Sequence, residues 1–190
     1  MQRLELVHDW LARQFPGRPL SVAPASADAS FRRYFRVTFD DGLTRIVMDA
    51  PPEHEDCRPF VHVAGLLHEA GVHAPEILAE DLERGLLLLT DLGSTTYLDA
   101  LDASNADDLF RDALDALVKW QLASRPDALP PYDEALLRRE LNLFPDWYVA
   151  RHLGSPLTAP QQEALERIQV LLLQNVLAQP KVFVHRDYMP

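Results

Sequence analysis

The order of strand-like and helical patterns is the feature that most limits how this chain can fold. Strand-like patterns lie between residues 33 and 90, and helical patterns dominate afterwards. The apolar run LLLLT at residues 86–90 and the polar residues that follow it mark the change. Because strands and helices are segregated along the chain, the sequence predicts an α+β protein with two lobes. We place the lobes at residues 1–92 and 93–190.

The first lobe is predicted to be an antiparallel sheet with two helices. Apolar residues recur at helical spacing near the N-terminus until Pro16-Gly17, and again before Gly71. Alternating apolar residues on either side of Asp41-Gly42 predict a hairpin. The predicted segments are helices over 4–11 and 60–70, a hairpin over 35–48, and strands near Ile77 and at 86–90.

The second lobe is predicted to be mostly helical. Apolar positions indicate helices over 109–120, 136–152 and 158–177. Thr158 and Gln161 have the spacing of a capping box, which predicts where the last helix begins. The apolar stretch KVFV at 181–184 predicts one further strand near the end of the sequence.

Composition excludes several classes of function. The formal net charge of -11 repels phosphate backbones and anionic lipids, so we expect neither a nucleic-acid nor a membrane partner. Cys57 is the only cysteine, which excludes an internal disulfide, and no two histidines have the i, i+4 spacing of a zinc site. The charged N-terminus and the shortness of the longest aliphatic run, 86–89, predict a cytoplasmic protein.

His185-Arg186-Asp187 is the motif most suggestive of chemistry. In kinase-type enzymes, the aspartate of such a triplet orients the attacking hydroxyl and accepts its proton. Asp187 is therefore the predicted catalytic base. The metal-binding asparagine of the same pattern would be at position 192, beyond the last residue given.

The connector after the apolar run is a candidate adenine-binding segment. In a two-lobed kinase, backbone N–H and C=O groups near Thr90, Asp91 and Leu92 would hydrogen-bond the adenine ring. The alternative is an ordinary buried strand followed by a turn.

A loop of small residues, ADASF at 27–31, leads into the first strand of the hairpin. Such a loop lets backbone amides approach phosphate oxygens, although it lacks a GxGxxG pattern. Ser30 belongs to this loop, and Arg32 and Arg33 could add charge-assisted hydrogen bonds. The alternative is that both arginines are ordinary solvated strand residues.

Five segments together resemble the aminoglycoside phosphotransferase family: ASADASFRRYFRV, IVMDAPPE, LLLLTDLG, YDEALLRRELNLFPDWYVARHLG and VFVHRDYMP. The resemblance implies a protein-kinase-like fold and transfer of the γ-phosphoryl group of ATP, with Mg²⁺. It is strongest to bacterial kinases that phosphorylate the anomeric hydroxyl of amino sugars, N-acetylmuramate and N-acetylglucosamine, in cell-wall recycling. It also implies that about half of the helical lobe is missing, so we expect no metal ligand within this chain and an inactive 190-residue fragment.

One departure from the general kinase pattern concerns the strand lysine that contacts the phosphates. The chain contains only Lys119 and Lys181, and neither lies in the sheet-containing lobe. The expected position is occupied by Met48 or Asp49. The charge of the triphosphate must therefore be met by arginines, metal or backbone amides.

Glu140 and Trp147 are the candidates for binding the sugar, as a hydroxyl-binding carboxylate and a flat ring face. Alternatively, Glu140 pairs with neighbouring arginines and Trp147 is part of the core. Two competing functions stay open: a related kinase for aminoglycosides, choline or homoserine, and a noncatalytic nucleotide-binding module. The sequence does not predict an oligomeric state.

Overall fold

The computed structural model describes residues 2–27 and 30–189. The chain forms two compact units, which divide within α4 (Ala106–Leu122) between Trp120 and Gln121. This division concerns compactness, and the predicted boundary between lobes at residue 92 stays a prediction. Among the described residues, no helix combines the length and the apolar character needed to cross a membrane.

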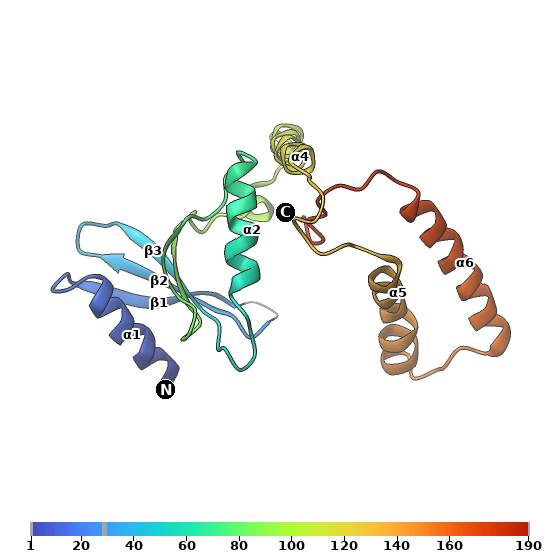
Figure 1. Ribbon diagram of the computed structural model, residues 1–190, viewed down its shortest axis with the longest axis horizontal. Helices are drawn as coiled ribbons and strands as arrows, with labels where there is room; N and C mark the ends of the chain where they lie inside the picture. Colours follow the sequence, from blue (N-terminus) through green and yellow to red (C-terminus); the bar gives the residue numbers. More distant parts are fainter. Residues whose placement is uncertain (1, 28–29, 190) are drawn as a thin grey trace. The chain divides into compact units, whose positions relative to one another are not determined.

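The first unit contains a five-stranded sheet in which every neighbouring pair is antiparallel (Figure 1). The strand order is β1-β2-β3-β5-β4. The predicted hairpin is confirmed, with its turn at Asp41-Gly42 between β2 and β3. The strands are β1 (Leu20–Ala27), β2 (Arg33–Phe39), β3 (Thr44–Asp49), β4 (Ile77–Asp81) and β5 (Leu86–Thr90).

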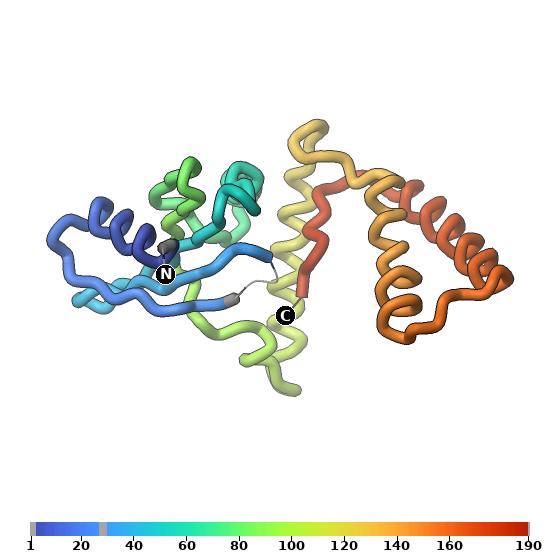
Figure 2. Tube along the Cα trace, turned by 90° about the horizontal axis from the view of Figure 1, so that it is seen from below, coloured from blue at the N-terminus to red at the C-terminus, as the bar shows by residue number. Residues whose placement is uncertain are grey.

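Strand β1 was not predicted, and it lies at the edge of the sheet beside β2 (Figure 2). Its sequence, LSVAPASA, offers little of the apolar alternation that identifies a strand. Pro24 cannot donate to a ladder, and a proline in a sheet is tolerated mainly at an edge. The register shifts between Pro24 and Ser26, as at a β-bulge.

The sheet is covered by one helix on each face, and both helices were predicted. Helix α1 (Gln2–Gln14) packs Val7, Trp10 and Leu11 against one face, together with Leu86 and Leu88 of β5. Helix α2 (Arg58–Glu69) packs on the other face, where Leu87 and Leu89 are buried. Since successive strand residues point to opposite faces, this two-sided cover explains why β5 is a continuous apolar run.

Beyond the sheet, a short helix precedes the long helix at the unit boundary. Helix α3 (Tyr97–Ala100) begins at Thr96, whose hydroxyl accepts from the Asp99 N–H while the Asp99 carboxylate accepts from the Thr96 N–H. This reciprocal arrangement is a capping box. Helix α4 confirms the helix predicted over 109–120.

The second unit contains three helical segments. Helix α5 (Glu134–Leu143) begins at Asp133 and continues into the π-helix η1 (Phe144–His152), while α6 (Ala159–Leu177) has the predicted capping box at Thr158. The sequence predicted one helix over 136–152, but the hydrogen bonding changes at Phe144-Pro145. Proline supplies no N–H, so the regular ladder cannot continue through it.

Helices α5 and α6 lie side by side in both views (Figures 1 and 2). The Arg138 guanidinium donates to the Glu166 carboxylate at 3.0 Å and also to Glu134 at 3.2 Å. The first of these bonds joins the two helices.

The described residues contain no strand after Thr90, so the strand predicted at 181–184 is absent. Phe183 is buried, and its N–H donates to the Ser124 hydroxyl at 2.7 Å. A side chain therefore satisfies the backbone group that a neighbouring strand would satisfy in a ladder. The prediction was wrong because apolar character alone does not provide a partner strand.

Candidate active site

Ser30 and Arg32 lie together at the turn that leads into β2. The Ser30 hydroxyl accepts from the Arg32 backbone N–H at 3.2 Å and from the Arg32 Nε at 3.0 Å. These two bonds hold the arginine beside the predicted phosphate loop. Residues 28 and 29 of that loop lie outside the described residues, so its contacts with phosphate stay a prediction.

Arg33 is held by a buried carboxylate at the end of β3. Asp49 has no solvent exposure, and it lies directly opposite Arg33 in the β2–β3 ladder. Asp49 accepts from the Arg33 guanidinium and from Arg3 of α1, whose Nε is 3.0 Å from Oδ1. Arg3 also donates to the Arg84 carbonyl at 2.8 Å. Two guanidinium groups and one carboxylate give this group of three side chains one net positive charge.

Asp49 of this cluster, Arg3–Asp49–Arg33, is one of the two residues at the strand position where the general kinase pattern predicts a lysine. The Arg33 side chain remains 48% exposed, so it can approach a ligand while Asp49 fixes its position. A guanidinium held in this way loses little conformational freedom when it binds an anion. The sequence indicated Arg33 and Asp49, but it contained no signal for Arg3.

Asp49→Asn is expected to lower the free energy of unfolding by about 1–3 kcal/mol, because two charged donors lose their charged acceptor. Solvent screening of the partly exposed arginines places the effect toward the lower end. Urea denaturation of the purified protein measures it. Asp56→Asn is the control, since the Asp56–Arg58 pair is exposed on both sides. A loss no larger than that of the control would mean that the cluster does not stabilise the fold.

The side chain of Asp91 is used to fix the connector. It is 4% exposed and accepts from Arg36 of β2 at 2.6 Å and 3.1 Å. The hydrogen bond from Arg36 holds the pKa of Asp91 below its usual range. Arg36 also donates to the Gly93 carbonyl at 2.9 Å, and the Gly93 N–H donates to Asp91 at 2.9 Å. Sequence reasoning missed Arg36, which joins the connector to the sheet.

Thr90 is bound to the residue that precedes β4. Its N–H donates to the Glu76 carbonyl at 3.0 Å, and its hydroxyl accepts from the Glu76 N–H at 2.9 Å. Leu92 is about half exposed. Because the Thr90 N–H already has an acceptor, the candidate donors for adenine in this connector are the backbone groups of Asp91 and Leu92.

The predicted catalytic triplet lies in the second unit, outside any helix or strand. Asp187 is exposed, and Arg186 before it has a positive φ of 75°. The Arg186 Nη2 donates to the Glu140 carboxylate at 3.1 Å, and its Cζ lies 5.6 Å from the centroid of the Tyr132 ring. The structure therefore connects Asp187, through its neighbour, to Glu140.

Trp147 lies on the π-helix and is 56% exposed. The Arg151 Cζ lies 4.0 Å from the centroid of its ring, within the range of a cation–π contact. One ring face is thus covered by a guanidinium. Phe144, Tyr148 and His152 form a stacked row along the same segment, with centroids 5.7 Å and 5.5 Å apart.

Residues 2–27 and 30–189 contain no group of three or more His, Cys, Asp or Glu side chains arranged to hold a metal ion.

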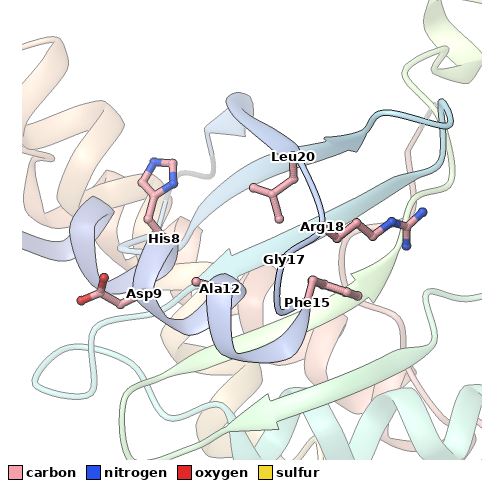
Figure 3. A pocket seen from close by; sticks show the side chains of 7 residues that line it. All are labelled: His8, Asp9, Ala12, Phe15, Gly17, Arg18 and Leu20. Carbon is pink, nitrogen blue, oxygen red and sulfur yellow. The ribbon is translucent and has the colours of Figure 1, made fainter.

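A hollow of about 400 Å³ lies beside α1, and none of the predicted site residues is among those that line it (Figure 3). Its polar lining consists of His8, Asp9 and Arg18, but the Arg18 guanidinium points away from the other two. Arg18 instead bonds Asp41 at 2.5 Å and lies over the Phe39 ring. Because the polar groups do not converge, this hollow is not a candidate for the site.

Comparison with known proteins identifies relatives over most of the chain. The family described as "Phosphotransferase enzyme family" (APH) matches residues 21–190. The N-acetylmuramate/N-acetylglucosamine kinase of Pseudomonas aeruginosa is 61% identical over 172 residues, 90% of this chain and 51% of that protein. The kinase of the same name from Neisseria meningitidis is 42% identical over 193 residues, 100% of this chain and 57% of that protein. The chain thus spans about half the length of these curated relatives.

A solved structure supports the fold independently of close sequence similarity. The crystal structure of a Thermobifida fusca protein described as a fructosamine-3-kinase matches with a TM-score of 0.53 at 17% identity. The match covers 94% of this chain and 65% of that protein. Together with the antiparallel sheet and its helices, it confirms the predicted kinase-like α+β fold.

Proposed function

This chain belongs to the phosphotransferase enzyme family, and we propose that the protein is an ATP-dependent kinase of amino sugars. Its acceptors are N-acetylmuramate and N-acetylglucosamine, and it phosphorylates their anomeric hydroxyl during cytoplasmic cell-wall recycling. The observation that carries the proposal is the 61% identity over 172 residues to a kinase of that name. The proposal concerns the whole protein, since the chain spans about half of that relative.

In this proposal, Asp187 accepts the proton of the attacking hydroxyl. Phosphoryl transfer needs little covalent chemistry from the protein, which acts mainly by positioning and by stabilising charge. The Asp187 side chain is exposed among the described residues, so its carboxylate is accessible to a substrate. Trp147 is proposed to contact the sugar through the ring face that Arg151 does not cover.

ATP would supply the transferred phosphoryl group, and residues of the first unit would bind it. Backbone groups of Asp91 and Leu92 would bond the adenine, in a connector that Arg36 holds to the sheet. Arg32 and Arg33 would contact the triphosphate, each fixed by a neighbour, Ser30 and Asp49 respectively. Arginines bind phosphate oxygens through charge-assisted, often bidentate, hydrogen bonds.

We propose Mg²⁺ as the metal, as in the general scheme of phosphoryl transfer. The described residues form no metal-binding group of their own.

Arg32→Ala with Arg33→Ala is expected to weaken ATP binding by about tenfold or more, because each lost bond joins a charged donor to a phosphate oxygen. Adenosine has no phosphate, so its affinity should change little. Calorimetric titration with both ligands measures the difference. Arg45→Ala removes an arginine of β3 that bonds the Thr44 carbonyl, and it serves as the control. If both ligands lose affinity equally, the two arginines are structural.

The proposed function is tested with the complete gene product, ATP and Mg²⁺. N-acetylmuramate and N-acetylglucosamine should yield sugar phosphates, whereas the methyl glycoside of N-acetylglucosamine should yield none, because its anomeric oxygen is blocked. Product from the methyl glycoside would place the phosphate on another hydroxyl. Turnover of aminoglycosides, choline or homoserine in place of the amino sugars would favour the related kinases. Nucleotide binding without phosphorylation of any of these acceptors would favour a noncatalytic module.

A further inference from the structure

Glu140 and Arg186 join a regular helix to the predicted catalytic triplet within the second unit. Glu140 lies on α5, and its Oε1 accepts from the Arg186 Nη2 at 3.1 Å. The residue after Arg186 is Asp187. We propose that Glu140 is a positioning residue, which holds the segment carrying Asp187 through Arg186, and that it does not bind the sugar. This inference rests on the proposed function, because it assumes that Asp187 acts in catalysis.

The triplet depends on side-chain contacts for its conformation. Residues 180–189 lie outside any helix or strand, so no ladder of backbone hydrogen bonds fixes them. Arg186 has a φ of 75°, a value that a residue with a side chain adopts only when its surroundings enforce it. The Arg186 guanidinium provides these contacts, with the Glu140 carboxylate and with the face of the Tyr132 ring.

The partners of Arg186 come from one fixed part of the unit. Tyr132 directly precedes Asp133, whose carboxylate accepts from the Leu136 N–H at 2.9 Å and caps α5. Helix α5 is in turn joined to α6 by the bond from Arg138 to Glu166 at 3.0 Å. Arg186 is therefore anchored on a capped helix that a second helix supports.

A second contact holds the same segment three residues earlier. The Phe183 N–H donates to the Ser124 hydroxyl at 2.7 Å, and the Phe183 side chain is buried. Between the bonds at Phe183 and Arg186 only two residues remain, and Asp187 follows immediately. Loss of the Glu140 bond would leave the Asp187 side of the segment with fewer constraints.

The electrostatic surroundings also disfavour a sugar-binding role for Glu140. Its Oε1 is 3.1 Å from the Arg186 Nη2 and 3.5 Å from the Arg139 Nη2. A sugar hydroxyl at this oxygen would be a neutral donor sharing the acceptor with charged donors, which bind it more strongly. The two guanidinium groups therefore compete with the sugar for the same acceptor.

The kinetic test uses Glu140→Gln in the complete gene product, assayed with ATP, Mg²⁺ and N-acetylglucosamine. Hydrogen bonds to charged groups shift equilibria by roughly 10- to 100-fold, and partial exposure places this one near the lower end. We expect kcat to fall by about tenfold, with the KM for the sugar within about twofold of wild type. A raised KM with an unchanged kcat would overturn the inference and assign Glu140 to sugar binding.

A double-mutant cycle tests whether Glu140 acts through Arg186. Arg186→Gln should lower kcat by a similar factor, and the double variant Glu140→Gln/Arg186→Gln should lose no more than the more severely affected single variant. Independent roles would instead multiply to about a hundredfold loss. Glu163→Gln, which removes an exposed ion pair to Arg167 within α6, should leave kcat unchanged.

Hydrogen exchange of the Phe183 N–H, which bonds the Ser124 hydroxyl, gives a readout that does not need turnover. Glu140→Gln should accelerate exchange of this amide several-fold, while Glu163→Gln should not. Unchanged exchange in the Glu140 variant would overturn the inference, whatever the kinetics. If the wild-type protein phosphorylates no amino sugar but the exchange result holds, the proposed function fails and the positioning of the segment stands.

Discussion

Asp187→Asn in the complete gene product should lower kcat by roughly 10²-fold or more, within the usual effect of removing a general base. The amide has nearly the shape of the carboxylate, but it cannot accept the proton of the sugar hydroxyl. The loss should appear in kcat and kcat/KM together, because the missing interaction develops in the transition state. Initial rates of sugar phosphate formation measure it.

Nucleotide affinity should be almost unchanged in this variant, since the contacts proposed for ATP come from Arg32, Arg33 and the backbone groups of Asp91 and Leu92. Titration with ATP provides the comparison. The neighbouring Arg186→Gln is a useful reference, because it should disturb the same segment and still leave the carboxylate in place. Turnover of Asp187→Asn near the wild-type rate would remove Asp187 from the mechanism.

Features that depend on neighbouring residues were predicted well from the sequence. The hairpin turn at Asp41-Gly42 and the capping box of Thr158 and Gln161 both involve contacts within a few residues. The strand β5 could be identified from its apolar run, because all four of its leucines are buried and the run reflects this burial. In such segments the local preference and the tertiary structure agree, and pattern analysis is then sufficient.

Other parts of the fold depend on partners that a pattern does not reveal. Strand β1 has small residues and Pro24, and it is a strand because β2 offers an edge. The stretch at 181–184 has a strand-like sequence, but its Phe183 N–H bonds Ser124. Within the described residues it has no strand partner. Whether a segment becomes a strand is decided by the availability of a neighbouring edge.

The candidate site shows the same limit at the level of side chains. Residue types made Arg33, Asp91 and Asp187 candidates for the site, and this stays a prediction, but they did not predict the partners Asp49 and Arg36. The bonds Arg3–Asp49 and Arg36–Asp91 join residues 46 and 55 positions apart. For Glu140, the sequence left open a pairing with neighbouring arginines, and the Arg139 Nη2 is indeed 3.5 Å from its Oε1. The shorter bond, at 3.1 Å, comes from Arg186, 46 positions away, and was not predicted. Contacts of this range follow from the packing of whole elements, which a single sequence does not specify.

Gly85→Ala is expected to destabilise the protein by about 3–5 kcal/mol, which combines the cost of a left-handed residue with that of overpacking. Gly85 ends the turn between β4 and β5 with a φ of 68°. A Cβ at this position would lie 1.8 Å from the Ala50 carbonyl oxygen. That atom belongs to the backbone, so it cannot move aside as a flexible side chain could. Urea denaturation measures the loss.

Gly42→Ala separates the two causes, because Gly42 also has a positive φ, 81°, but nothing lies within 4 Å of its Cβ position. It should cost only about 1–2 kcal/mol, the penalty of the backbone conformation alone. Equal losses for the two variants would show that the contact with Ala50 is relieved without cost. The position also matters for function, because the Ala50 N–H donates to the Gly85 carbonyl at 2.8 Å and Ala50 directly follows Asp49. A displaced turn would therefore move the carboxylate that holds Arg33, and ATP affinity should fall together with stability.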